Sequence, residues 1–389
     1  MQSFTYHTHN GEQNFDGHNT AEEMIAAAEN NSGRRICRKM TIKSSTKQYQ
    51  VNIFEDFSVI EHLEIDDKTF VVIDQNLVRL YGEKLFGRIA PEQCYILEAL
   101  EENKTMDTVL EICERMTNIP AKRNARLISF GGGIVQDVTG VVANLLYRGI
   151  KWEFYPTTLL AACDSCIGGK TSLNYKGYKN LLGTFYPPDQ INICTPFFKT
   201  LEKRDFQSGL GEVVKFNIMF GRSGIERMEQ NISYLLQRND AKLCEFVKSS
   251  LEFKKDFIEE DEFDKGVRVH LNFAHTFGHA FETVSHYKIP HGTAVAMGTI
   301  VANRISLERK WLEEEDVLRI ENVLGRIINI DIENIELNID NIVDAIHKDK
   351  KQTSRQITAV LMYDDMKLRI VNDVKVNEIV DAVTYLLDF

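Results

Sequence analysis

Two features that would place this chain at a membrane or on a nucleic acid are missing from its sequence. No apolar run among the 389 residues approaches the roughly 18 residues of a membrane-spanning helix. The 46 Lys and Arg are outnumbered by 57 Asp and Glu, which gives a net charge of −11. Proteins that bind nucleic acids or anionic membranes carry a basic excess instead. We therefore expect neither partner, although a local basic pocket can still bind a small anionic substrate.

The number and spacing of the cysteines also do not indicate a set of disulfides. Seven cysteines at irregular spacing are typical of reduced thiols in a cytoplasmic protein. Cys163 and Cys166 form one C-x-x-C, which is compatible with a redox pair or half of a zinc site. No second such pair is present and CDSCIGGKT has the composition of a loop, so ordinary thiols are favoured. The N-terminus has no basic region followed by an apolar one, so we expect no secretory signal and a cytoplasmic location.

The sequence changes in character along its length, which predicts three segments. Residues 1–40 are polar and are expected to form an arm with one short helix in EEMIAAAE. Residues 41–196 alternate strand and helix patterns, including FVVIDQN, TMDTVLEICERM and ARLISFGGGIVQDVTGVVANLL. This alternation predicts an α/β domain with a mostly parallel, Rossmann-like sheet.

Residues 197–389 have a mainly helical pattern. Apolar residues recur with a period of about 3.6 in RDFQSGLGEVVKFNIMF and in three later segments. Only QITAVLMY and KLRIVND resemble strands, and together they predict a small hairpin. A cleft between the α/β domain and this mainly helical domain is the expected ligand site.

A glycine turn lies between a predicted strand and a predicted helix. Gly131, Gly132 and Gly133 follow the apolar ARLISF. Glycine backbone can approach a phosphate closely, and a helix N-terminus supplies free N–H donors. The turn is compatible with a dinucleotide site, but it is not G-x-G-x-x-G, and a tight strand-to-helix turn explains it as well. Asp74, at the end of an earlier strand, is compatible with a ribose contact or with a turn.

Residues 156–180 collect lysines around a glycine pair after a strand. Clustered lysines in a glycine-rich loop favour an anion pocket over solvated side chains. Arg148, just upstream, can add a guanidinium to a phosphate. The polar residues of this segment are Asp164, Lys170, Lys176, Lys179 and Asn180.

Half of the ten histidines fall within residues 270–291. His275 and His279 are spaced i, i+4, which places them on one helix face, and His291 opens the next segment. A catalytic divalent metal site needs about three such ligands and an open position. Spacing alone pairs His275 with His279, with Glu212 in GLGEVVK as a further donor. The alternative is a chance group of surface histidines, against which the neighbouring Phe273, Phe277 and Phe281 argue.

Several longer motifs in order resemble the sugar phosphate cyclases, and most of all the 3-dehydroquinate synthases. They are GGGIVQDVTG, PTTLLA, DSCIGGKTSLN, KNLLGTFYPP, SGLGEVVK, GVRVHLNFAHTFGHAFE, HGTAVAMG and DKK. The resemblance extends from about residue 70 to 351 and omits the N-terminal arm. It implies a dehydroquinate synthase-like fold and a homodimer in which Arg148 reaches the neighbouring subunit's phosphate pocket.

The resemblance also implies a cofactor and a metal. Residues at the NAD positions of the family are Asp74, Glu101, Lys104, Gly131, Gly132, Gly133, Asp137, Thr157, Thr158 and Lys179. The metal, zinc or cobalt, is held by one Glu and two His, which correspond to Glu212, His275 and His291. His279 then becomes a substrate-side residue, which replaces the pairing expected from spacing.

Polar residues match the substrate positions of the family. The catalytic set is Lys170, Lys215, His279, Asn272 and Arg268, and the substrate-binding set is Asp164, Arg148, Asn180, Lys254 and Lys351. The chain departs from the family at Leu100, Gln136 and Pro187, which bears on the exact substrate more than on the chemistry.

The implied reaction converts DAHP, the phosphorylated sugar acid of the shikimate pathway, to 3-dehydroquinate. A bound nicotinamide oxidises a ring alcohol, phosphate is eliminated, the hydride returns and the ring recloses as a carbocycle. The alternatives are cyclases of the amino-dehydroquinate, 2-deoxy-scyllo-inosose or epi-valiolone type, a glycerol-dehydrogenase-like oxidoreductase, and a non-enzymatic NAD-binding homologue. The lysine-rich segment disfavours glycerol, which carries no anion, and Arg268 with Lys254 favours a carboxylate-bearing substrate.

Overall fold

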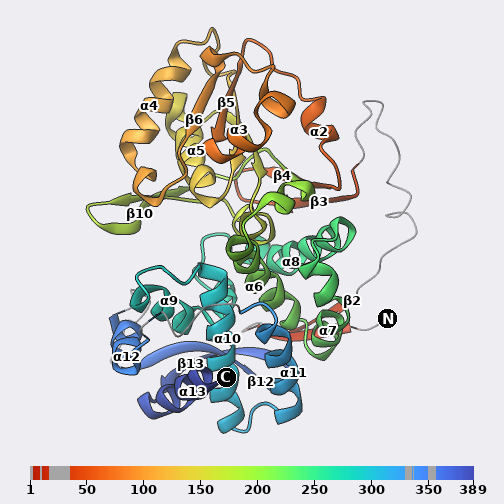
Figure 1. Ribbon diagram of the computed structural model, residues 1–389, viewed down its shortest axis with the longest axis vertical. Coiled ribbons are helices and arrows are strands. Elements are labelled where there is room, and N and C mark those ends of the chain that lie inside the picture. The colour runs from red at the N-terminus through yellow and green to blue at the C-terminus, as the bar shows by residue number, and fades with distance from the viewer. Residues whose placement is uncertain (1–2, 9–10, 17–35, 329–334, 336, 349–355) are drawn as a thin grey trace. The chain divides into compact units, whose positions relative to one another are not determined.

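The computed structural model describes residues 3–8, 11–16, 36–328, 335, 337–348 and 356–389 (Figure 1). The chain forms two compact units. The α/β unit comprises Ala21–Leu201 and Leu243–Phe263, and the helical unit comprises Met1–Thr20, Glu202–Lys242 and Asp264–Phe389. The helix expected in EEMIAAAE lies outside the described residues.

A seven-stranded sheet forms the centre of the α/β unit, in the order β3-β4-β11-β8-β7-β5-β6. Only β3 and β4 pair antiparallel, so the predicted parallel α/β architecture is confirmed. The strands are β3 (Arg38–Lys43), β4 (Gln48–Phe54), β5 (Thr69–Asp74), β6 (Cys94–Leu97), β7 (Arg126–Gly131), β8 (Lys151–Pro156) and β11 (Gln190–Cys194).

Helices connect these strands and cover the sheet. The α-helices are α2 (Ser58–Glu61), α3 (Gln75–Tyr81), α4 (Met106–Thr117) and α5 (Gly133–Leu145), with α8 (Asp240–Glu260) joining from later in the chain. Short 3-10 or π turns are η1 (Gly82–Phe86), η2 (Pro91–Gln93), η3 (Glu101–Asn103), η4 (Leu146–Arg148), η5 (Ala161–Ser165) and η6 (Thr195–Thr200). Strands β5 and β7 are almost wholly buried, which explains their continuous apolar sequences.

The order of the strands creates a switch point between β5 and β7. The chain leaves β5 for β6 at the edge, but leaves β7 for β8 on the opposite side. Parallel α/β sheets bind ligands at the carboxyl ends of the strands at such a point. Asp74 ends β5 and Gly131 ends β7, so both lie at this position.

The lysine-rich segment forms a hairpin, whereas its composition predicted a loop. Strands β9 (Lys170–Tyr175) and β10 (Tyr178–Phe185) pair antiparallel through a turn in which Lys176 and Gly177 have φ of 49° and 82°. Buried Thr171 anchors β9 on α5, where a Cβ on Gly140 would lie 2.3 Å from the Thr171 methyl group. Packing on a helix thus stabilises strands in a segment whose glycines had predicted a loop. CDSC, also expected to be a loop, overlaps the helical turn η5, and its two buried cysteines form no disulfide.

The helical unit is built around α10 (His291–Glu308), most of whose residues are buried. The other helices are α6 (Lys203–Ile218), α7 (Arg222–Leu236), η7 (Val267–Asn272), α9 (His275–Val284), α11 (Glu314–Gly325), α12 (Ile339–Lys348) and α13 (Val376–Asp388). The predicted terminal hairpin is present as β12 (Ile357–Tyr363) and β13 (Lys367–Val374), and a second hairpin consists of β1 (Ser3–Thr8) and β2 (Gly11–Asp16).

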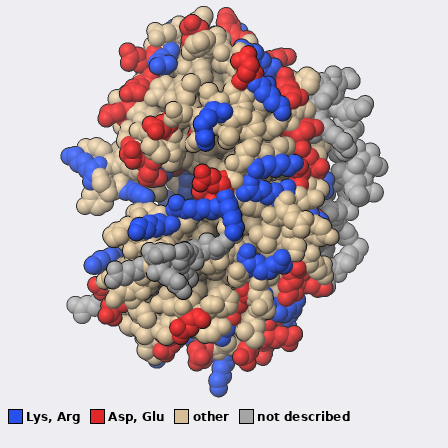
Figure 2. Space-filling model, in the orientation of Figure 1, with Lys and Arg blue, Asp and Glu red and all other residues tan. Residues whose placement is uncertain are grey.

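Acidic and basic side chains are interspersed on the face of the molecule shown in Figure 2. Among the described residues, no helix has both the length and the apolar character needed to cross a membrane.

Candidate active site

Glu212, His275 and His291 lie together in the helical unit. The Nε2 atoms of His275 and His291 lie 3.7 and 3.4 Å from Oε1 of Glu212. One ligand atom from each of the three residues lies within 4.8 Å of the others. The structure therefore brings together the three residues that were expected to hold a metal.

His275 and His291 each use the other ring nitrogen, Nδ1, in a hydrogen bond to a neighbouring acceptor. His275 donates from Nδ1 to the Phe273 carbonyl at 3.0 Å, and His291 donates from Nδ1 to Oε2 of Glu282 at 3.1 Å. Such a bond fixes both the tautomer and the ring orientation of a metal-binding histidine. Both Nε2 atoms thus lie on the Glu212 side.

Glycines bring Glu212 and His291 together by allowing α6 and α10 to touch. A Cβ on Gly211 would lie 1.9 Å from the Gly292 carbonyl oxygen, and a Cβ on Gly292 would lie 1.8 Å from the Ser208 carbonyl oxygen. The Gly292 N–H also donates to the Ser208 hydroxyl at 3.0 Å. Glu212 and His291 directly follow and precede these glycines, so the backbone contact sets their separation.

A similar close approach positions His275 at the start of α9. A Cβ on Gly298 of α10 would lie 2.4 Å from the Ala274 carbonyl oxygen. Ala274 has a φ of 69°, a left-handed conformation that is uncommon for a residue with a side chain. The chain therefore turns sharply where α9 meets α10, and His275 is the first residue after the turn.

Lys215 supplies a buried positive charge beside the three residues. Its Nζ lies 2.5 Å from Oε2 of Glu212, one helical turn earlier, and donates to the Leu271 carbonyl at 3.4 Å. Both side chains are almost completely buried. The buried negative charge of Glu212 is therefore paired with the positive charge of Lys215.

A second group shares one histidine with the first. One ligand atom each from His279, Glu282 and His291 also lies within 4.8 Å of the others. The His279 ring centroid is 5.4 Å from that of His275 and 6.1 Å from that of His291. Because Nδ1 of His291 is engaged by Glu282, only Nε2 remains for a metal, and it faces Glu212.

The donor set of Glu212, His275 and His291 fits a divalent transition metal. Two neutral imidazoles and one carboxylate suit zinc or cobalt, and three protein ligands leave a coordination position open. Arg268 and Asn272 belong to the same unit, in η7, where Arg268 is buried and Asn272 half-buried. Lys351 lies outside the described residues.

The glycine turn of the α/β unit forms the N-terminus of α5. A Cβ on Gly132 would lie 3.0 Å from the Thr158 methyl group, whereas a Cβ on Gly133 would meet only the Ser165 hydroxyl, at 3.9 Å. The Thr157 N–H donates to the Gly131 carbonyl at 2.9 Å, which fixes the neighbouring strand end. An open glycine face at a helix N-terminus fits the pyrophosphate of a dinucleotide.

Asp74 caps the helix that follows its strand. Its carboxylate accepts the N–H of Asn76 at 2.8 Å, and burial raises its pKa. This is the turn role considered for Asp74, and it leaves the second carboxylate oxygen at the switch point.

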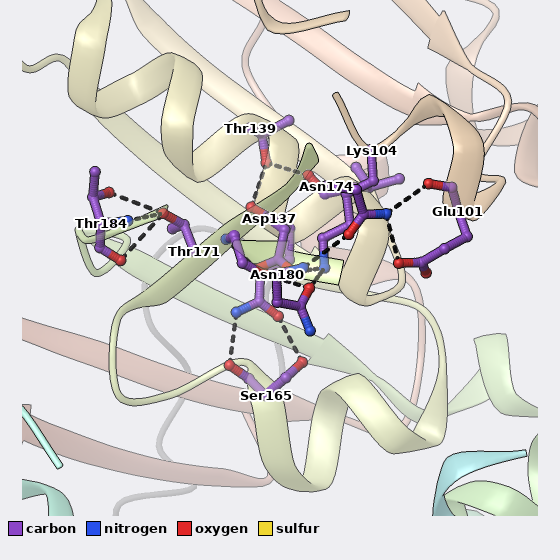
Figure 3. A network of polar contacts seen from close by, with 12 residues as sticks. Glu101, Lys104, Asp137, Thr139, Ser165, Thr171, Asn174, Asn180 and Thr184 are labelled. Atoms are coloured by element: carbon purple, nitrogen blue, oxygen red, sulfur yellow. Dashed lines mark hydrogen bonds and ion pairs between the residues drawn. The ribbon is translucent and has the colours of Figure 1, made fainter. Parts of the chain in front are cut away.

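A polar network connects the expected cofactor residues with the hairpin (Figure 3). Lys104 forms an ion pair with Asp137 and donates to Oδ1 of Asn180 at 2.7 Å. The Ser172 N–H and hydroxyl donate to Asp137 at 3.1 and 2.9 Å. Burial raises the pKa of Asp137, and the Lys104 ammonium and Ser172 oppose that shift.

Further expected substrate residues also lie in the α/β unit. Lys254 of α8 donates to both the side chain and the carbonyl of Asp164 at 2.8 Å, so these two are brought together. Lys170, Lys179 and Arg148 are exposed.

Sequence reasoning missed Glu282, Ser172 and Asn174. Glu282 lies seven residues after His275 on the same helix face, a spacing that identifies it once α9 is recognised. Ser172 and Asn174 alternate along β9, which was expected to be a loop, so their shared face was not evident.

Comparison with known families covers both units. Residues 94–208 match the N-terminal region of 3-dehydroquinate synthase and residues 209–352 match its C-terminal region. The chain belongs to the 3-dehydroquinate synthase family. The predicted family resemblance is thereby confirmed.

Individual relatives agree with the family match. The chain is 36% identical to a 3-dehydroquinate synthase of Clostridium tetani over 335 residues, which covers 85% of this chain and 87% of the relative. A crystal structure of 2-deoxy-scyllo-inosose synthase complexed with carbaglucose-6-phosphate, NAD+ and Co2+ is 26% identical with a TM-score of 0.75, covering 86% of this chain and 95% of that one. The chain shares its fold with a 2-epi-5-epi-valiolone synthase from Streptomyces hygroscopicus. The two are 24% identical with a TM-score of 0.76, and the match covers 89% of this chain and 99% of that one.

Proposed function

We propose that this chain is a 3-dehydroquinate synthase, which converts DAHP to 3-dehydroquinate with loss of phosphate. The observation that carries this proposal is the family match across both units, together with 36% identity to the Clostridium tetani enzyme. The reaction is redox-neutral overall, so NADH should not accumulate.

The expected cofactors are NAD and a divalent metal, zinc or cobalt. When bound, the nicotinamide supplies reversible hydride acceptance and the metal supplies a Lewis acid. Gly131 to Gly133, with Asp137 and Lys104, would hold NAD, and Glu212, His275 and His291 would hold the metal. The orientation of both imidazoles by Nδ1 hydrogen bonds supports this assignment.

The remaining polar side chains would bind and orient an anionic substrate. His279 is proposed to donate a hydrogen bond to the leaving phosphate, and Lys215 to hold charge beside Glu212. Arg268 and Lys254 are proposed to contact anionic groups of the substrate, since a guanidinium binds a carboxylate in a directional, bidentate manner. Lys170, Asp164, Asn180 and Asn272 complete the proposed polar set.

We further propose a cytoplasmic homodimer in which Arg148 reaches the neighbouring subunit. The exposed position of Arg148 at the end of η4 supports this role.

A cyclase acting on a neutral sugar phosphate is the second candidate. It is favoured by the structural likeness to 2-deoxy-scyllo-inosose synthase at 26% identity. The higher identity to the Clostridium tetani relative and the presence of Arg268 favour the carboxylate-bearing substrate.

Parallel assays distinguish these candidates. The purified chain, loaded with NAD and zinc, is incubated separately with DAHP, sedoheptulose phosphate, glucose phosphate and glycerol, while phosphate and NADH are both measured. We expect phosphate release from DAHP alone with no net NADH. Turnover of a neutral sugar phosphate but not DAHP would support the second candidate, and steady NADH formation from glycerol would indicate a dehydrogenase.

A further inference from the structure

Asn174 connects two parts of the network in Figure 3 that have different expected ligands. Its Nδ2 donates to the Glu101 carbonyl at 2.9 Å and to Oε1 of Glu101 at 2.8 Å. Its Oδ1 accepts the N–H of Asn180 at 2.9 Å, and its own N–H donates to the Lys104 carbonyl at 2.8 Å. One side chain thus contacts the Glu101–Lys104 segment and the outer strand of the hairpin.

Asn180 has a backbone conformation that needs such support. Its φ is 53°, in the left-handed region, and the pairing of β9 with β10 shifts register between Tyr178 and Leu182. Because of this register shift, the Asn180 N–H is not used in the pairing of β9 with β10, and it donates to Asn174 instead. In this conformation the Asn180 amide oxygen accepts from Lys104 at 2.7 Å and lies 2.9 Å from the Ser172 hydroxyl oxygen.

We propose that Asn174 is a positioning residue that couples NAD binding to binding of the substrate's phosphate. NAD binding that orders Glu101 and Lys104 would, through Asn174, hold Asn180 in place for the anion, and binding of the anion would favour NAD by the same factor. The inference rests on the proposed function, because it takes Glu101 and Lys104 as cofactor residues and Asn180 as a substrate residue.

The amide group is specifically required for both connections. Aspartate at this position keeps an acceptor for the Asn180 N–H, but it loses the donor to Glu101 and places a second carboxylate beside it. Alanine removes both connections. Asn174→Asp therefore disturbs mainly the cofactor side, whereas Asn174→Ala uncouples the two sides.

The test measures NAD affinity by titration calorimetry in the full-length chain, with and without saturating inorganic phosphate. We expect phosphate to tighten NAD binding in the unaltered chain by a factor within the about 5- to 150-fold range typical of coupled sites. In Asn174→Ala the factor should fall close to one. In Asn174→Asp the NAD affinity without phosphate should fall. Asn118→Ala, at an exposed position of the same unit, is the matched control and should behave as the unaltered chain does.

The possible failures are distinguishable. If the unaltered chain turns over DAHP but phosphate leaves its NAD affinity unchanged, or if Asn174→Ala keeps the full coupling factor, the inference is overturned and the proposed function stands. If the unaltered chain neither binds NAD nor turns over DAHP, the proposed function itself fails. Melting curves identify any variant that does not fold. The nearly isosteric Asn174→Asp then decides, because it lacks the donor to Glu101 and should also lower the coupling factor, and a full factor in that variant overturns the inference.

Discussion

At the scale of single residues, the helical unit uses hydrogen bonds to orient its imidazoles. The Phe273 carbonyl and the Glu282 carboxylate each accept from an Nδ1 atom, so His275 and His291 both present Nε2 to Glu212. A ligand that is already oriented loses less conformational freedom when it binds a metal. The residues behind the expected ligands therefore contribute to affinity without touching the ion.

Replacing Glu282 should weaken metal binding although it is not an expected ligand. Glu282→Ala should lower zinc affinity by about 10- to 100-fold, because His291 loses its orienting acceptor. Glu282→Gln should lower the zinc affinity less, since the amide oxygen of glutamine can accept the same hydrogen bond. Chelator competition measures the affinity, and Glu308→Ala, exposed at the end of the helix that begins at His291, is the control. If Gln weakens binding as much as Ala, Glu282 is itself a ligand.

His279 should be needed for turnover but not for the metal. His279→Ala should keep one metal per chain, while activity falls by about 10²- to 10⁴-fold, as expected for loss of a proton donor. His291→Ala should instead lose most of its metal. Elemental analysis together with phosphate release gives both values, and a metal-free His279→Ala protein would favour the group of His279, Glu282 and His291.

Cys37 should be the more reactive of two partly exposed thiols. A hydrogen bond from the Cys244 thiol lowers the pKa of Cys37 to about 7, whereas burial raises the pKa of Cys94 to about 11. The thiolate is the reactive form, so alkylation of Cys37 should rise as the pH passes through 7, with Cys94 much slower. Iodoacetamide labelling followed by mass spectrometry measures both rates. Cys244→Ala should slow the alkylation of Cys37 at pH 7. Equal alkylation rates at Cys37 and Cys94 would contradict the expectation.

At the scale of elements, glycines determine how closely the helices approach. Gly211 and Gly292 bring the α6 and α10 backbones into contact, and Gly298 brings α10 against the residue that precedes α9. Each of the three expected metal ligands lies within one or two residues of such a contact or of the turn beside it. The spacing of the ligands is therefore a property of helix packing and not of the local sequence.

A single methyl group at Gly292 should separate these helices. Gly292→Ala places a Cβ 1.8 Å from a backbone oxygen that cannot move alone. We expect a loss of stability of about 1–3 kcal/mol, typical of overpacking, together with weakened zinc binding. Urea unfolding and zinc titration measure the two effects. Gly82→Ala, where a Cβ would meet nothing within 4 Å, should change neither, and normal zinc affinity in Gly292→Ala would show that the helix contact does not position the ligands.

At the scale of the whole molecule, the chain crosses between its two units more than once. Leu243–Phe263 belongs to the α/β unit although the segments before and after it belong to the helical unit. The sheet begins at Arg38, and β3 buries Met40 and Ile42 against its neighbours. The division into residues 1–40, 41–196 and 197–389 remains a proposal.

Two N-terminal deletions should behave differently. Removal of residues 1–35 should leave turnover and melting temperature unchanged, because the expected catalytic residues all lie later. Removal of residues 1–43 also deletes β3, and loss of two buried apolar side chains costs about 1.5–3 kcal/mol each, so the melting temperature should fall by several degrees. Thermal unfolding and phosphate release test this, and a folded but inactive product of the shorter deletion would show that the arm takes part in the chemistry.

The sequence alone determined the features that depend on local periodicity or on ordered motifs. Continuous apolar runs predicted the buried strands β5 and β7, and a period of about 3.6 residues predicted the helices α4 to α6. The long motifs identified the family, because many residue types in order rarely coincide by chance. Edge strand β3 was not predicted because only two residues of RKMTIK, Met40 and Ile42, are apolar, which is too short an alternation to identify a strand.

Only the tertiary structure decided which distant residues share a site. Spacing alone paired His275 with His279, but the contact between Gly211 and Gly292 brings Glu212, 63 positions earlier than His275 in the chain, beside both His275 and His291. Likewise, packing on α5 turned a glycine-rich segment into a hairpin and aligned Asn174 with Glu101 and Asn180. Local sequence sets what each segment prefers, whereas long-range packing sets which side chains meet, and that information is contained in no single segment.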